Sequence, residues 1–274
     1  MKDKVYRAFR YIFKGIPNTV INKNIVEIGK TDSLDGKRIL ITGGNRGIGF
    51  EIASKSIKHG AEVYIVGRSE SKLIEAKRRL GERCHIFVYD MSSVNDNQNI
   101  LEFIERETID VLVNNAGISL HEKSSFDVTV EGFEEQFGIN LKTPYFLSIG
   151  FAEVCIRNKR EGSIINIVSE RGLYCDDLPY GLTKSALISF TRGFARRVIK
   201  KGIRVNAIAP GVTATEMTGY REDENLFNEY ICSNRTFLAS EVAEVAVFLI
   251  SDISSCISGD VIACNSGNHL RCDW

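Results

Sequence analysis

The sequence predicts an α/β fold: one domain with a doubly wound parallel sheet of about seven strands and helices on both faces. Two observations lead to this fold class. From residue 37 onward, short apolar runs alternate with amphipathic helical patterns, which is typical of right-handed βαβ units around a buried parallel sheet. A glycine-rich turn, residues 42–49, follows the first apolar run. We therefore divide the chain into an N-terminal extension, residues 1–36, and an α/β domain, residues 37–274.

The expected elements follow one another along the chain. Short apolar runs, such as Arg38-Ile-Leu-Ile-Thr42, predict buried strands, and the segments between these runs show helical periodicity. Strands are expected at residues 38–42, 62–66, 85–89, 110–113, 163–168, 204–208 and 260–263. Helices are expected at residues 47–59, 70–81, 96–107, 129–158 and 179–201. Residues 212–238 are expected to form a lid over the substrate.

Composition excludes several classes of protein. The 274 residues are 43% hydrophobic and 26% charged, which is ordinary for a globular protein. Lys and Arg total 35 and Asp and Glu also total 35, so no net field attracts nucleic acid, and no nucleic-acid partner is expected. No apolar run approaches the roughly 20 residues of a membrane span. The seven cysteines are odd in number and form no CxxC, which favours reduced thiols in a cytoplasmic protein and no metal site.

The first fourteen residues differ from the rest. They carry five basic residues against Asp3, and Val5, Phe9, Ile12 and Phe13 fall on one face of a helix. Three interpretations of this basic amphipathic helix remain open. It docks on the protein's own surface or on a neighbouring subunit, it lies weakly on an anionic membrane surface, or it is a disordered or targeting leader followed by a linker.

The glycine-rich turn has the features of a phosphate site. Gly43, Gly47 and Gly49 stand between the first expected strand and the first expected helix. Glycine allows a sharp turn and a close approach of the backbone to a pyrophosphate, and the free N–H groups at a helix N-terminus bind that anion. Because the turn lies in the first βαβ unit, it predicts a dinucleotide cofactor.

The end of the second expected strand indicates which dinucleotide binds. An acidic residue at this position accepts a hydrogen bond from the ribose 2′-hydroxyl of NAD. This chain has Gly67, Arg68 and Ser69 there instead. Arg68 can pair with a 2′-phosphate, and Arg46 of the glycine turn can add a second cation. We therefore expect NADP(H) as cofactor in preference to NAD(H).

Two residues in the last expected helix carry acid–base chemistry. Tyr180 and Lys184 are four positions apart, so their side chains lie on one face of the helix. A nearby ammonium group, together with the positive charge of an oxidised nicotinamide, stabilises a phenolate and should lower the pKa of the phenol. Tyr180 is then expected to be the general acid/base and Lys184 its electrostatic partner and a ribose ligand. Ser169, after the fifth expected strand, is expected to bind the substrate oxygen.

From about Lys37 to Gly267, the sequence resembles the short-chain dehydrogenase/reductase family. The motifs that carry the resemblance occur in the family's order: TGxxxGxG (residues 42–49), Asp90, NNAG (residues 114–117), Asn140, Ser169, YxxxK (residues 180–184) and PGxxxT (residues 210–215). The resemblance implies a Rossmann fold and transfer of a hydride between a nicotinamide and a carbonyl or secondary alcohol. It also implies a homodimer or homotetramer.

The resemblance assigns roles residue by residue. The catalytic set comprises Asn140, which holds a water of a proton relay, with Ser169, Tyr180 and Lys184. Asp90 belongs to the adenine pocket, and the PGxxxT segment contacts the carboxamide of the nicotinamide. The expected cofactor-binding residues are Gly43, Asn45, Arg46, Gly47, Ile48, Gly49, Arg68, Ser69, Asp90, Met91, Asn115, Ala116, Gly117, Tyr180, Lys184, Pro210, Gly211, Val212, Thr213 and Thr215.

The substrate is expected to be a small-molecule carbonyl or alcohol that contacts Ser169, Glu170, Leu173, Tyr174, Tyr180 and Tyr220. A ketone, a 3-oxoacyl thioester and a sugar or polyol all suit these polar and aromatic groups. Outside enzymes, a non-catalytic NADP-binding protein is the alternative.

The chain departs from the family pattern in three places. Only 11 positions separate Ser169 from Tyr180, charged residues follow Ser169, and Asn265-Ser266-Gly267 stands where relatives often have DGG.

Overall fold

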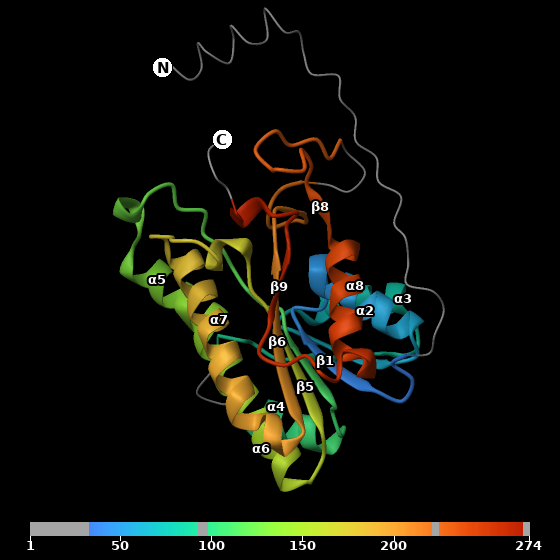
Figure 1. Ribbon diagram of the computed structural model, residues 1–274. Helices are drawn as coiled ribbons and strands as arrows, with labels where there is room; N and C mark the ends of the chain where they lie inside the picture. Colours follow the sequence, from blue (N-terminus) through green and yellow to red (C-terminus); the bar gives the residue numbers. More distant parts are fainter. Residues whose placement is uncertain (1–32, 93–97, 221–224, 271–274) are drawn as a thin grey trace, which may run out of the picture.

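The computed structural model describes residues 33–92, 98–220 and 225–270 (Figure 1). Seven strands form one parallel sheet in the order β3-β2-β1-β4-β5-β6-β9. Their bounds are β1 Arg38–Thr42, β2 Glu62–Gly67, β3 Cys84–Val88, β4 Val111–Asn114, β5 Gly162–Ile167, β6 Ile203–Pro210 and β9 Val261–Cys264. The helices are α2 Gly47–Lys58, α3 Glu70–Leu80, α4 Gln98–Arg106, α5 Val130–Phe137, α6 Thr143–Arg157, α7 Pro179–Val198 and α8 Ala239–Ile250. The expected fold class is confirmed.

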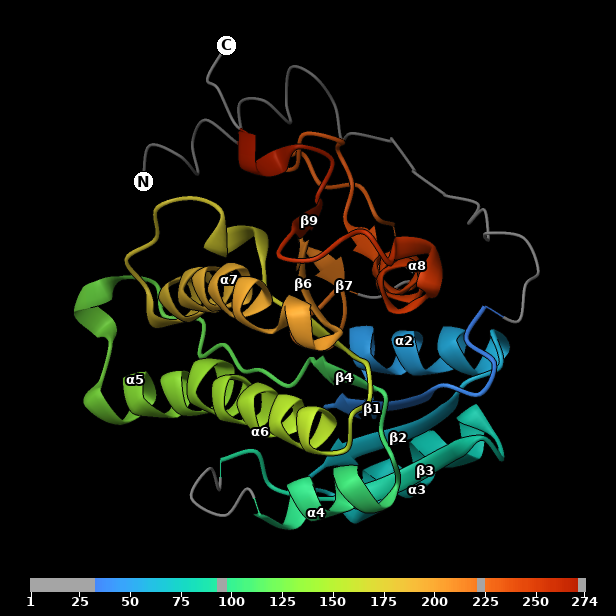
Figure 2. The same cartoon turned by 60° about the horizontal axis from the view of Figure 1, so that its bottom comes forward.

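Alternate residues of each central strand enter opposite cores. In β1, Ile39 and Ile41 pack in the core beneath α2, α3 and α8, whereas Leu40 packs in the core beneath α4, α6 and α7. All three of these residues are fully buried, so the middle of β1 is apolar on both faces rather than alternating in polarity. Figure 2 shows α2 and α8 on one side of the sheet and α6 and α7 on the other.

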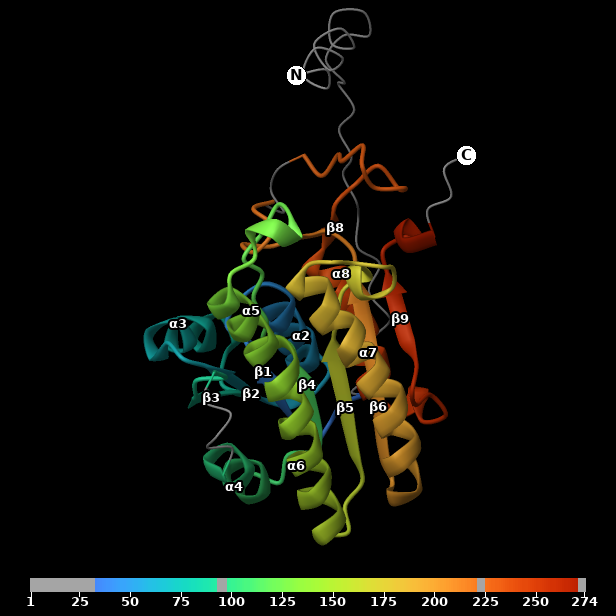
Figure 3. The ribbon, with the colours of Figure 1, turned by 90° about the vertical axis from the view of Figure 1, so that its left-hand side faces the viewer.

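The structure corrects the expected elements in three places. It contains a helix that the sequence analysis did not identify, α8, and a two-stranded parallel pair made of β7 (Thr213–Ala214) and β8 (Phe237–Leu238). The helix expected over residues 129–158 is interrupted by a π-helical turn, Gly138–Lys142, between α5 and α6. Figure 3 shows these three pieces following one another beside α7.

The boundary of the α/β domain lies earlier than residue 37. Leu34 is fully buried in the core beneath α2, and its N–H donates to the His59 carbonyl oxygen at 3.0 Å. Leu34 therefore belongs to the fold rather than to the extension. The amphipathic helix expected in the first fourteen residues lies outside the described residues.

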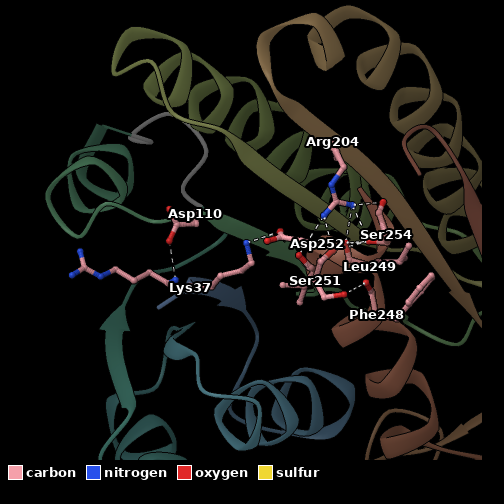
Figure 4. Close-up of polar contacts among 10 residues, drawn as sticks. Lys37, Asp110, Arg204, Phe248, Leu249, Ser251, Asp252 and Ser254 are labelled. Atoms are coloured by element: carbon pink, nitrogen blue, oxygen red, sulfur yellow. Dashed lines mark hydrogen bonds and ion pairs between the residues drawn. The ribbon is translucent and has the colours of Figure 1, made fainter. Parts of the chain in front are cut away.

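Arg204 caps the C-terminal end of α8 (Figure 4). Its guanidinium donates to the carbonyl oxygens of Leu249 at 2.9 Å and of Ile250 and Ser251 at 3.3 Å. The last carbonyls of a helix have no partner within the helix, and Arg204 supplies donors to them alongside the Ser254 hydroxyl, which donates to the Leu249 and Ser251 carbonyl oxygens. Arg204 is the second residue of β6, so this contact fixes α8 against the sheet at the amino ends of the strands.

No helix among the described residues combines the length and the apolar character that a membrane span requires. The same residues contain no group of three or more His, Cys, Asp or Glu side chains arranged to hold a metal ion.

Candidate active site

A cavity of about 290 Å³ lies at the carboxyl ends of the strands. In an open parallel sheet, ligands bind at this edge, where the strand order reverses about the first strand. Most residues expected to bind the cofactor or to act in catalysis line it: Gly43, Asn45, Arg46, Gly47, Ile48, Arg68, Asp90, Met91, Asn115, Ala116, Gly117, Ser169, Tyr180, Lys184, Pro210, Gly211, Thr213 and Thr215. Gly49, Ser69, Asn140 and Val212 are not among the lining residues.

The glycine turn presents an uncapped helix N-terminus to this cavity. Gly43 and Gly47 have φ values of 65° and 54°, which favour glycine. α2 begins at Gly47, its N-cap Arg46 makes no side-chain capping bond, and its first turn contains no acidic residue. The first N–H groups of α2 therefore have no side-chain acceptor and fit an anion such as a pyrophosphate.

Gly49 has a packing role. A Cβ at this position would overlap the side-chain amide of Asn115. That amide donates to the carbonyl oxygens of Thr42 at 2.9 Å and Gly43 at 3.1 Å. Gly49 thus allows Asn115 to hold the turn in place, which explains why it does not itself line the cavity.

Two arginines lie where a ribose phosphate is expected. Arg68 and Arg46 both line the cavity, and Arg46 forms an ion pair with Glu216 of the lid segment. The backbone N–H of Ser92 donates to Asp90 and lowers the pKa of this carboxyl, with a smaller contribution from the positive charge of Arg68. Ser69 is the N-cap of α3 and its hydroxyl pairs with Ser71 at 3.2 Å.

Lys184 is almost fully buried, Tyr180 is partly exposed, and both line the cavity together with Ser169. The Lys184 Nζ lies 5.5 Å from the centre of the Tyr180 ring and donates to the Ile167 carbonyl oxygen at 3.1 Å. Burial lowers the pKa of Lys184 to about 8 because the charged form loses its hydration. The ammonium and its neutral form are therefore both accessible near neutral pH.

Burial also raises the pKa of Tyr180 above the usual value for a phenol. A hydrogen bond with Ser169 and the positive charge of Arg171 act in the opposite direction. In the protein by itself, loss of hydration outweighs these favourable contacts. The expected lowering of this pKa depends in part on the positive charge of an oxidised nicotinamide and stays a prediction.

Asn140 sits in the π-helical turn and is almost fully buried. Its amide group accepts from the Ile118 N–H and donates to the Ile118 carbonyl oxygen, both at 2.8 Å. A Cβ on Gly117 would lie 3.2 Å from the Asn140 Oδ1 and 3.4 Å from the Lys184 Nζ. The structure thus brings Asn140 close to Lys184, behind the wall of the cavity.

Four residues expected to contact the substrate do not line this cavity. Glu170 is buried, and its carboxylate accepts from the amides of Asn265 at 3.0 Å and Asn268 at 3.0 and 3.1 Å. The expectation for Glu170 is therefore corrected, because these two amides hold its carboxylate. Leu173 packs against the small core of Val168, Leu187 and Ile188. The two tyrosines, Tyr174 and Tyr220, are about 40% exposed.

The cavity includes residues that the sequence analysis did not single out for the site. The additional lining residues are Gly67, Tyr89, Ile118, Glu135, Ile139, Ile167 and Val168. Glu216, Met217 and Thr218 also line the cavity and lie within residues 212–238, the expected lid. Tyr89 directly precedes Asp90, so adjacency to a motif was the signal available for it. Glu135 and Ile139 reach the cavity from α5 and the π-helical turn, for which the sequence offered no signal.

Comparisons with known proteins agree with this geometry. A family model described as enoyl-(acyl carrier protein) reductase matches residues 43–269. The chain is 33% identical to the 3-oxoacyl-[acyl-carrier-protein] reductase FabG of Chlamydia pneumoniae over 81% of this chain and 93% of that protein. It is 32% identical to the gluconate 5-dehydrogenase of Gluconobacter oxydans over 83% of this chain and 92% of that protein.

Among solved structures, the fold is similar to that of a 3-ketoacyl-(acyl-carrier-protein) reductase from Brucella melitensis complexed with NADH. The TM-score is 0.79 at 28% identity, over 86% of this chain and 99% of that one.

Proposed function

The chain belongs to the short-chain dehydrogenase/reductase family, and from this premise we propose that it is an NADP(H)-dependent oxidoreductase that reduces a ketone. One observation carries the proposal. Ser169, Tyr180 and Lys184 line the same cavity as the uncapped N-terminus of α2 and Arg68. A proton donor and a dinucleotide site thus share one cavity, as hydride transfer to a carbonyl requires.

The residues present fit a nicotinamide dinucleotide. The backbone at Gly47 and Ile48 would hold the pyrophosphate, Asp90 would take the adenine, and Lys184 the ribose near the nicotinamide. Arg68 and Arg46 favour NADPH because both can pair with a 2′-phosphate, and no acidic residue stands at the end of β2. When bound, this cofactor supplies the hydride.

The chain's own residues would manage the proton. Tyr180 donates its phenolic proton to the carbonyl oxygen, and the Ser169 hydroxyl donates a hydrogen bond to the same oxygen. Lys184 stabilises the phenolate that results, since its ammonium lies within one turn of the helix. Asn140, fixed by Ile118 beside Lys184, would hold the water that returns the proton.

A 3-oxoacyl thioester is the first substrate class to test, because the relatives that the chain resembles include 3-oxoacyl-[acyl-carrier-protein] reductases. A sugar or polyol is the second, since a gluconate 5-dehydrogenase matches over a similar length. A chain that binds NADP without turnover is the alternative outside enzymes.

The decisive experiment follows the loss of reduced-nicotinamide absorbance with 3-oxoacyl thioesters, sugar ketones and simple ketones, using NADPH and NADH in parallel. We expect turnover with NADPH and a loss of about 10²–10⁴-fold in Tyr180→Phe. Turnover that persists in the variant would refute the role of Tyr180. Tight NADPH binding with no turnover of any compound would favour the binding protein.

The proposal extends to partners and location. We propose a homodimer or homotetramer, supported by exposed aromatic side chains on the outer face of α6, where Tyr145 and Phe146 are 39% and 47% exposed. Sedimentation equilibrium tests this oligomeric state directly.

We propose a cytoplasmic protein, supported by free cysteines among the described residues. For residues 1–36, co-sedimentation with anionic vesicles, with and without residues 1–30, distinguishes membrane contact from the other interpretations.

A further inference from the structure

The shortened segment between Ser169 and Tyr180 contains an ion pair that the reaction described above does not use. Arg171 donates to Asp176 through two nitrogens: Nε to Oδ2 at 2.5 Å and one terminal nitrogen to Oδ1 at 2.7 Å. The Asp176 side chain is only 5% exposed and that of Arg171 is 34% exposed. Such a bidentate pair fixes the plane of the guanidinium as well as its distance.

Asp176 in turn is fixed to the start of α7. Its Oδ1 accepts from the backbone N–H of Leu178, the N-cap residue of α7, at 3.0 Å. A Cβ on Gly181 would overlap the Asp176 carboxylate, so the carboxylate lies where only glycine leaves room. The first turn of α7 carries Tyr180, and the ion pair is therefore anchored on the same turn as the phenol.

The anchored guanidinium lies beside the Tyr180 ring. The Arg171 Cζ is 5.9 Å from the ring centre, close to the distance of the Lys184 Nζ on α7. The other groups that act on the phenol are Ser169 at the end of β5 and Tyr174, while Glu135 of α5 lines the same cavity. The positive charge of Arg171 lowers the pKa of Tyr180, and Tyr174 raises it.

We propose that Arg171, held by Asp176 against Gly181, is a positioning residue that acts through Tyr180 by placing a second, permanent cation beside the phenol. The inference deepens the proposed function and rests on it for the role of Tyr180. Lys184 loses its charge as pH rises through about 8 in the chain without cofactor, whereas a guanidinium stays charged. Arg171 thus maintains a positive field at the phenol in the range where Lys184 becomes neutral.

A titration tests this without any substrate. Tyrosine labelled with ¹³C at Cζ is incorporated into the full chain, and the NMR signal of Tyr180 is assigned by its absence in Tyr180→Phe. A unit charge at about 6 Å in a medium between water and protein shifts a pKa by about 0.5 to 2 units. We expect the midpoint of Tyr180 to rise by that amount in Arg171→Met and to stay near that of the parent chain in Arg171→Lys.

The matched control is Arg192→Met, which removes one positive charge from an exposed position farther along α7. It should leave the midpoint of Tyr180 unchanged. Thermal unfolding of each variant reports whether the fold survives. An Arg171→Met chain that is folded and has the parent's midpoint overturns the inference, as does an equal shift in Arg192→Met.

Kinetics separate this role from a purely structural one once a substrate is in hand. Alcohol oxidation needs the phenolate, so the pH at which its kcat reaches half-maximum should move to higher pH in Arg171→Met by the shift seen in the titration. The plateau at high pH should be retained. A loss of equal size at every pH would overturn the inference. Absence of turnover in the parent chain would count against the proposed function alone, because the titration still decides the role of Arg171.

Discussion

Burial changes the acid–base behaviour of two side chains in the cavity in ways that have measurable consequences. Lys184 is 4% exposed, and no anionic partner offsets the loss of hydration that lowers its pKa to about 8. The pKa of Tyr180 is raised for the same reason, since burial disfavours the charged phenolate. In both residues, burial shifts the protonation equilibrium toward the neutral form.

For Lys184, this produces a pH-dependent stability. Between pH 8 and 10.5 the unfolded chain holds a proton on Lys184 that the folded chain has lost, so the free energy of unfolding rises with pH. Lys184→Met lacks this contribution. We expect the parent chain to gain about 1–3 kcal/mol relative to the variant over this range. Urea unfolding of both chains at several pH values measures this gain. A difference in free energy of unfolding that stays constant with pH would contradict the prediction.

Arg68 should control the choice of cofactor. Replacing it in Arg68→Asp removes a cation at the ribose site and introduces the acidic residue found in NAD sites. We expect the KM for NADPH to rise about tenfold to a hundredfold, as for loss of a charge-assisted hydrogen bond, with little change for NADH. Arg78→Ala is the control, because Arg78 lies on α3, the helix that follows Arg68 in the chain. An unchanged ratio of the two KM values would refute this role.

Contacts between elements decide how the cavity is held together. Glu170 follows Ser169, and its partner Asn268 also accepts from the Cys232 backbone N–H at 3.3 Å. Asn265, the other partner, lies against Gly211, where a Cβ would be 2.9 Å from the Asn265 Cβ. The Glu170 carboxylate therefore links the end of β5, the lid segment and the C-terminal residues 265–270.

Removing this carboxylate should loosen the C-terminal segment. Glu170→Ala removes the carboxylate oxygens that accept from the buried amides of Asn265 and Asn268, which costs about 1–3 kcal/mol of stability. Hydrogen exchange should accelerate in residues 265–270 and around Cys232, while α2 keeps its protection. Unchanged exchange in these segments would show that other contacts hold them.

The cap on α8 leads to a separate expectation. In Arg204→Met, the Leu249 carbonyl oxygen still accepts a hydrogen bond from the Ser254 hydroxyl. The hydrogen bonds from Arg204 to the Ile250 and Ser251 carbonyl oxygens are lost. We expect a loss of about 1–3 kcal/mol in denaturant unfolding. Lys37→Met, which removes the Lys37–Asp252 ion pair of the same region, should cost less than about 1 kcal/mol because Asp252 is exposed. Equal losses of stability in the two variants would contradict a capping role for Arg204.

At the scale of the whole molecule, the described residues contain a complete parallel sheet covered on both faces. The first core residue in the described part of the chain is Leu34, so deleting residues 1–32 removes none of the described core. We expect the truncated chain to keep its melting temperature within about 2 °C, since such a shift corresponds to less than about 1 kcal/mol at this size. A second deletion, through residue 35, is the control. It should lower the melting temperature, because Leu34 is lost.

The positions of the sheet strands, the glycine turn and the spacing of Tyr180 and Lys184 were predictable from the sequence. Each depends on local periodicity or on a short motif, so neighbouring residues alone carry the signal. α8 was missed because apolar residues occupy most of its positions, which leaves only a weak helical stripe. Within α5–α6, the π-helical turn had no sequence signal of its own.

Only the tertiary structure decided the surroundings of the catalytic groups. Glu170 and Arg171 are adjacent in the sequence, yet one carboxylate is bound by amides 95 and 98 positions away while the guanidinium turns toward Tyr180. The raised pKa of Tyr180 likewise follows from burial by several elements. The sequence by itself determined the fold class and the identity of the reacting groups, because these follow from local pattern. Burial and long-range contacts, which set charge and orientation, exist only once distant segments pack together.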